Sequence, residues 1–127
     1  MATTEELYEK GQEVRRKLFG DPTLSSASAA GELAPEFMKI VTQTLFGEIY
    51  TRPALDLKTR SMITLAALCV LGREPQIRQH LIGALHVGVT REQIIEIFSQ
   101  MAFYGGIPVA LNAITVAKGV FDQQKIK

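Results

Sequence analysis

The sequence predicts an all-α fold of about six helices. No segment shows sustained alternation of apolar and polar residues, and no Asn-Gly or Asp-Gly pair marks a hairpin turn. Apolar residues instead recur at spacings of three and four, and glycine and proline divide the helical stretches at short intervals. Short connections favour roughly antiparallel neighbours. The 127 residues are expected to form one domain, residues 1–127.

Two helices are expected in the N-terminal part. The first covers residues 4–19 and ends at Gly20; its apolar stripe consists of Leu7, Val14 and Leu18. Residues 23–33 are rich in serine and alanine and fit either a loop or a short helix. A second helix is expected over about residues 34–50, with Pro35 in its first turn. The apolar face of that helix should consist of Phe37, Ile40, Val41, Thr44, Leu45 and Ile49.

A third helix is expected over about residues 57–71, with Asp56 as its N-cap. From Met62 onward this segment is apolar on all sides, so the helix should be buried on every side. Cys69 lies within it and is interpreted as a small buried side chain rather than a reactive thiol. A single cysteine also excludes an intrachain disulfide.

Three further helices follow, each with its own start signal. Pro75 suits the first turn of a fourth helix, which ends near Val87. Thr90 and Gln93 form a capping-box pattern for a fifth helix, which Gly105-Gly106 stops. The sixth extends from Pro108 to about residue 122.

The composition excludes several function classes. A net charge of +1 argues against nucleic-acid binding, and the run Arg15-Arg16-Lys17 is interpreted as a solvated helix face. The longest apolar run is too short to span a membrane and no signal pattern begins the chain, so a cytoplasmic protein is expected. The apolar fraction of 46% is high for a small chain and indicates large interfaces in a homo-oligomer.

A cluster of charged and polar residues is the candidate site. Glu48 and Arg52 lie four apart at the end of the second helix, and Arg60 lies at the polar start of the third. Charges beside a core need partners or a function, and a small anionic substrate would supply both. The alternatives are a helix-end salt bridge for the first two residues and an exposed arginine with a packed stem for Arg60.

The fourth helix adds the only imidazole that we consider for catalysis. His80 lies on or beside its apolar face, with Gln76 one turn earlier and Arg73 just before the helix N-terminus. The alternative is a core histidine bonded to a backbone carbonyl. His86 is interpreted as a surface or interface residue. The two histidines are six residues apart, so they lie on different helix faces and predict no metal site.

Three segments resemble the carboxymuconolactone decarboxylase family. They are FGEIYTRPALDLKTRSMITLAAL at 46–68, LGREPQIRQHLIGALHVGVTREQIIEIF at 71–98 and FYGGIPVALNAITVA at 103–117. Phe46 and Tyr50 depart from the family pattern, which has tryptophans there. Peroxidase-type relatives have cysteines where this chain has Arg73 and Gln76, so the resemblance argues against thiol peroxidase chemistry.

The resemblance implies an AhpD-like all-α bundle in trimers or hexamers. It implies decarboxylation of 4-carboxymuconolactone, a lactone dicarboxylate, to 3-oxoadipate enol-lactone without metal or organic cofactor. His80 would deliver the proton, Glu48 would orient it or relay the proton, and Arg60 would stabilise charge on the lactone oxygen. Substrate carboxylates would be bound by Arg52, Arg73 and Gln76. Another small carbonyl acid as substrate, or a non-catalytic oligomeric binding protein, are the alternatives.

Overall fold

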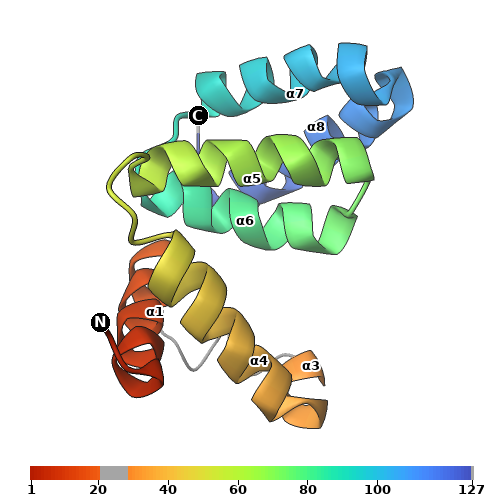
Figure 1. The fold of residues 1–127 in the computed structure, drawn as a ribbon. Helices are drawn as coiled ribbons and strands as arrows, with labels where there is room; N and C mark the ends of the chain where they lie inside the picture. Colours follow the sequence, from red (N-terminus) through yellow and green to blue (C-terminus); the bar gives the residue numbers. More distant parts are fainter. Residues whose placement is uncertain (21–28, 127) are drawn as a thin grey trace. The chain divides into compact units, whose positions relative to one another are not determined.

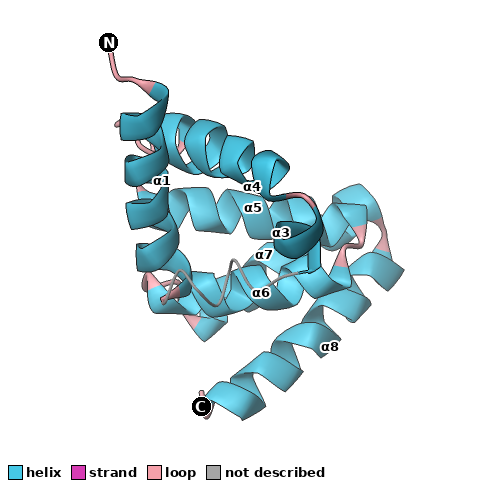
Figure 2. Cartoon of the chain, turned by 90° about the horizontal axis from the view of Figure 1, so that it is seen from below, coloured by secondary structure: helices cyan, strands magenta, loops and turns pink. Residues whose placement is uncertain are grey.

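The computed structural model describes residues 1–20 and 29–126. These residues form seven α-helices and one π-helix, and no strand occurs among them, so the predicted all-α fold is confirmed (Figure 2). The chain divides into two compact units, unit 1 (Met1–Leu57) and unit 2 (Lys58–Lys127) (Figure 1). No helix in the described ranges is long and apolar enough to cross a membrane.

Unit 1 begins with helix α1, Thr4–Phe19, whose bounds agree with the prediction. The hydroxyl of Thr3 caps it by accepting a hydrogen bond from the backbone N–H of Glu6 at 3.1 Å. Gly20 ends it with a φ of 82°, a left-handed conformation that glycine adopts without steric cost. Local signals therefore fix both ends of α1.

The second predicted helix consists of two parts. Helix α4, Pro35–Val41, continues into a π-helix, η1, Thr42–Ile49. The N–H of Tyr50 donates to the carbonyl of Leu45, five residues back, at 2.8 Å. A short helix, α3, Ala29–Leu33, precedes α4, and the other residues of the ambiguous segment 23–33 lie outside the described ranges.

The apolar face predicted for residues 34–50 is wrong. Phe37, Ile40 and Leu45 are exposed, and the buried residues of η1 are Thr42, Phe46 and Gly47. The prediction assumed a regular α-helical period. A π-helix has more residues per turn, so side chains beyond Val41 point in other directions than that period assigns to them. Phe37 and Ile40 lie in the regular helix α4, which has no buried residue.

Helices α1 and η1 touch backbone to backbone within unit 1. A Cβ atom added to Gly11 would lie 2.0 Å from the carbonyl oxygen of Thr42, and one added to Gly47 would lie 2.0 Å from that of Leu7. Both distances are far below a van der Waals contact. Only glycine allows the two helices to approach this closely at either point.

Unit 2 contains four helices in the predicted order: α5 (Leu57–Leu71), α6 (Glu74–His86), α7 (Arg91–Gly105) and α8 (Ile107–Gln124). The predicted capping box of α7 is present, with hydrogen bonds of 2.9 and 3.1 Å between Thr90 and Gln93. Three glycines with positive φ separate the four helices: Gly72, Gly88 and Gly106.

The core of unit 2 draws side chains from all four helices; among the largest fully buried ones are Leu65, Ile77, Leu81, Ile94, Phe98 and Val120. Cys69 belongs to this core, as predicted, and burial raises the pKa of its thiol. The prediction that α5 is buried on every side is wrong, because Ile63 and Leu71 are more than half exposed. A helix that is apolar all round does not reveal which of its faces the core takes.

Candidate functional site

Helix α6 places three of the six predicted site residues in unit 2. Arg73 is the N-cap residue and is exposed, and Gln76 is exposed one turn further along. His80 follows Gln76 by four residues, so the two share a face of the helix. His80 is half-buried, beside the buried Ile77 and Leu81. The predicted position of the imidazole, beside the apolar face, is confirmed.

Burial lowers the pKa of His80 from the ordinary 6.5 to about 4. The imidazole is therefore neutral at neutral pH. Desolvation penalises the charged form, so the free imidazole does not carry the proton that the predicted role requires. A neutral imidazole can accept a proton or hydrogen-bond to a ligand, and it donates a proton readily only after a nearby anion has raised its pKa.

We predict a pH-dependent stability that a His80→Gln variant lacks. The folded chain holds His80 neutral down to about pH 4, whereas an unfolded chain protonates it near 6.5. The unfolded state thus binds more protons between these values, and acidification destabilises the native protein by roughly 3 kcal/mol at most. Urea unfolding of both proteins from pH 7.5 to about 4 measures the difference. Parallel curves would contradict a lowered pKa.

Arg60 lies in the first turn of α5, in unit 2, and is half-buried. Its carbonyl accepts a hydrogen bond from the hydroxyl of Thr64 at 3.0 Å. Leu71, the last residue of α5, follows Arg60 by eleven positions, which is about 16 Å along a helix, and Arg73 comes two residues later. Arg60 and Arg73 therefore lie at opposite ends of α5.

The remaining two predicted residues, Glu48 and Arg52, belong to unit 1. Arg52 Nη2 lies 3.6 Å from Glu48 Oε1, and both side chains are about half exposed, at 58% and 51%. This geometry is that of a helix-end salt bridge, which contributes about 0.3 kcal/mol to stability. It agrees with the alternative interpretation of Glu48 and Arg52, a salt bridge between residues four apart at the end of a helix. Catalytic roles for these two residues stay predictions.

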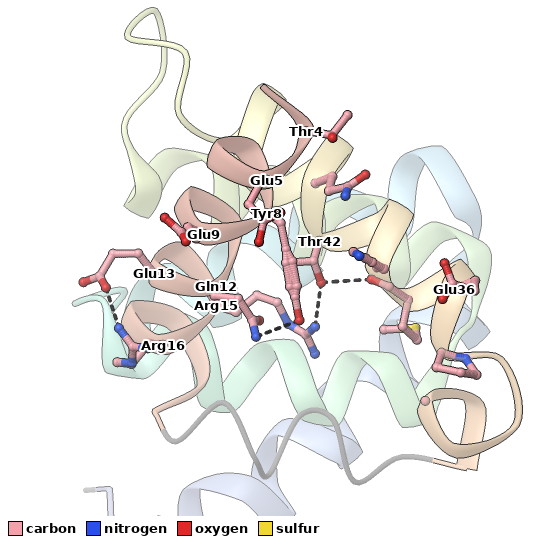
Figure 3. Close-up of a pocket in the computed structure, with 15 residues that line it drawn as sticks. Thr4, Glu5, Tyr8, Glu9, Gln12, Glu13, Arg15, Arg16, Glu36 and Thr42 are labelled. Atoms are coloured by element: carbon pink, nitrogen blue, oxygen red, sulfur yellow. Dashed lines mark hydrogen bonds and ion pairs between the residues drawn. The ribbon is translucent and has the colours of Figure 1, made fainter. Parts of the chain in front are cut away.

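Two hollows stand out on the described residues, and neither is lined by a predicted site residue. The smaller one, of about 320 Å³, lies in unit 2 and is lined by residues of α5 and α7, among them Met62 and Ile97. The larger one, of about 870 Å³, lies in unit 1 between α1 and the α4–η1 helix (Figure 3). No group of three potential metal ligands occurs among the residues that the structure describes.

Arg15 in the larger hollow was missed by the sequence analysis. The run Arg15-Arg16-Lys17 was interpreted as a solvated face, but Arg15 is only 6% exposed. Its Nη1 donates to the hydroxyl of Thr42 at 2.8 Å, and its guanidinium lies 5.8 Å from the centre of the Phe46 ring. Arg15 follows Gly11 by four residues and precedes Leu18 by three, and both of these residues are buried. This helical spacing was the signal in the sequence that Arg15 is buried as well.

Comparison with known proteins gives consistent results. Residues 35–119 match the carboxymuconolactone decarboxylase family. A 4-carboxymuconolactone decarboxylase of Acinetobacter baylyi is 32% identical over 92% of this chain and 88% of its own length. An uncharacterized 15.0 kDa protein of Paracoccus denitrificans is 32% identical over 94% and 91%. A nitrosuccinic acid decarboxylase of Metarhizium robertsii is 29% identical over 88% and 79%. The chain belongs to the carboxymuconolactone decarboxylase family.

Proposed function

We propose that this protein decarboxylates 4-carboxymuconolactone to 3-oxoadipate enol-lactone, without a metal or organic cofactor. The observation that carries the proposal is the half-buried His80, which shares a face of α6 with Gln76 in a member of this family. The Acinetobacter baylyi relative, named for this activity, supports the choice of substrate.

The substrate supplies its own electron sink. Breaking the bond between the ring carbon and its carboxylate releases CO2 and leaves an electron pair on the ring. This pair moves through the ring double bond to the lactone carbonyl oxygen. One proton then adds to the carbon next to that carbonyl and gives the enol-lactone. The protein has to bind a dianion, stabilise the charge on the lactone oxygen and deliver one proton.

His80 is the proposed proton donor. Its pKa of about 4 makes the free imidazole neutral, but two substrate carboxylates nearby would raise that pKa. Substrate binding would then be coupled to proton uptake by His80, and the imidazolium would give the proton to the ring carbon after CO2 has left. Its low intrinsic pKa makes the protonated form a strong acid toward the ring carbon, because the carbanion keeps the negative charge that the lost carboxylate carried.

The other predicted residues have roles that agree with their chemistry. Gln76, exposed and one turn from His80, offers an amide for a substrate carboxylate or carbonyl. Because α5 separates Arg60 from Arg73 within one chain, we propose that the two come from different copies in the oligomer. Arg60 would stabilise charge on the lactone oxygen, and Arg73 would bind a carboxylate. Glu48 and Arg52 stay in the proposal as an orienting and a binding residue, respectively. We also propose that the protein is cytoplasmic.

The direct test is CO2 release from 4-carboxymuconolactone by the purified protein. We expect multiple turnovers in metal-free buffer, with and without a chelator. A second candidate, decarboxylation of another small acid, is favoured by the nitrosuccinic acid decarboxylase among the relatives and by Phe46 and Tyr50 in place of tryptophans. Nitrosuccinate therefore belongs in the same assay. Stoichiometric binding without any CO2 release would favour a binding protein.

We also propose a homo-oligomer, a trimer or hexamer. Large apolar side chains are exposed at the end of α7 and the start of α8: Phe103 at 88%, Tyr104 at 76%, Ile107 at 64% and Leu111 at 58%. Patches of this kind on soluble proteins mark interaction sites, and further copies of the chain would cover them. Light scattering after gel filtration measures the number of copies.

A further inference from the structure

We propose that the larger hollow of unit 1 is a binding site for a small monocarboxylate, with Arg15 as the partner of the carboxylate group. This site, which we call the Arg15 pocket, is lined by residues of α1, α3, α4 and η1, among them Tyr8, Gln12, Arg15, Pro35, Met38 and Thr42. The proposal does not depend on the decarboxylase activity, because no residue of the pocket takes part in the proposed reaction.

Arg15 is a buried cation without an anionic partner in residues 1–20 and 29–126. The groups that interact with it are the hydroxyl of Thr42, the ring of Phe46 and, electrostatically, Tyr8, and none of them is a carboxylate. Its Nε is buried and has no hydrogen-bond acceptor among these residues. Burial of an unpaired charge is strongly unfavourable, and a bidentate carboxylate is the ligand that a guanidinium fits best.

Among the described residues, Nη1 is the one atom of the Arg15 guanidinium that donates a hydrogen bond. The hydroxyl of Thr42 accepts from Arg15 and donates to the carbonyl of Met38 at 2.9 Å, so it holds Nη1 in place (Figure 3). Gln12 donates to the hydroxyl of Tyr8 at 3.1 Å on the neighbouring turn of α1. The guanidinium is therefore held in position before a ligand arrives, which lowers the entropy cost of binding.

The charges around Arg15 restrict the ligand to one carboxylate. The lining also contains four glutamates, Glu5, Glu9, Glu13 and Glu36. Among the described residues of the lining, only Glu13 forms an ion pair, with Arg16, and Lys39 Nζ lies 5.7 Å from the centre of the Tyr8 ring. These carboxylates would repel a second negative charge on the ligand, whereas they would not repel a ligand whose remaining part is neutral or cationic.

Size and polarity indicate the remainder of the ligand. About 870 Å³ is within the range of small-molecule sites and exceeds what a bare acetate would fill. Tyr8, Pro35 and Met38 supply apolar surface next to the cation. The class that fits is a monocarboxylic acid with a ring-sized apolar body, neutral or carrying an amino group. The dianionic lactone of the proposed reaction does not belong to this class.

The experiment is an NMR titration of the full-length protein with benzoate as the probe. We expect the Arg15 Nε–H and Thr42 amide signals to shift, with a dissociation constant on the order of 1 mM. Phthalate, the matched dianion, should bind at least several-fold more weakly, and 4-(aminomethyl)benzoate should bind at least as well as benzoate. Wild-type protein whose Arg15 signal does not respond to about 20 mM benzoate would overturn the proposal.

Two variants separate ligand binding from a structural role. Arg15→Met keeps an apolar stem without charge, and benzoate affinity should fall at least tenfold while the melting temperature stays equal or rises. Lys17→Met, a change of an exposed cation of the same helix that does not line the pocket, should leave affinity unchanged. Equal affinity of Arg15→Met and wild type would refute the role of Arg15. If Arg15→Met does not fold, the Nε–H response of wild type decides the question.

Discussion

Replacing His80 by Gln is expected to lower kcat for 4-carboxymuconolactone by roughly 10²-fold or more, the range for loss of a general acid. Gln fills a similar volume and keeps hydrogen-bonding capacity, but it cannot deliver a proton. Because substrate binding by wild type would be coupled to protonation of His80, the variant should also lose that proton uptake. Steady-state CO2 release and calorimetry in buffers of different ionisation enthalpy measure the two effects.

His86→Gln is the matched control, because it makes the same chemical change at an exposed position of the same helix. It should retain wild-type kcat. A His80→Gln protein with the wild-type oligomeric state and near-normal turnover would refute the proton-donor role. Loss of turnover in both variants would indicate that the damage is to α6 rather than to proton delivery.

The second large effect concerns stability. Gly47→Ala is expected to destabilise the protein by at least about 3 kcal/mol, and Gly11→Ala by a similar amount. In each case the new methyl group would lie 2.0 Å from a backbone carbonyl oxygen of the facing helix, and a helix backbone cannot yield as a side chain can. Urea unfolding followed by circular dichroism measures the change.

Gly119→Ala provides the control for these glycine variants. Gly119 lies inside α8, and the nearest atom to an added Cβ is Arg78 Nη1 at 3.9 Å, an ordinary contact. Alanine there should stabilise the helix by up to about 1 kcal/mol. Similar stability for Gly47→Ala and Gly119→Ala would mean that α1 and η1 are not in backbone contact.

Helix positions could largely be predicted from the sequence because local signals determine them. Gly20, Thr90 with Gln93, and the glycines between the helices of unit 2 each act within one turn of the chain. The direction of side chains in η1 could not be predicted. It depends on a π-helical hydrogen-bond pattern, which places Phe46 and Gly47 against α1 and has no signature in hydrophobic spacing.

The place of His80 on its helix was predictable from the sequence, but the pKa of its imidazole was not. Spacing alone placed His80 beside the apolar face of its helix. Its lowered pKa arises from desolvation, and the degree of burial depends on the tertiary packing rather than on the spacing of apolar residues. Arg15 was missed for a related reason, because a run of three cations suggests solvent, whereas the packing of α1 against η1 buries the first of them.

The buried Cys69 allows the opening of unit 2 to be measured by alkylation of its thiol. It is the one cysteine in the sequence, and the core of unit 2 surrounds it. Alkylating reagents attack the thiolate, which burial disfavours by raising the pKa of the thiol. The mass added per unit time by iodoacetamide therefore counts openings of unit 2, with no engineered label and no competing sulfhydryl.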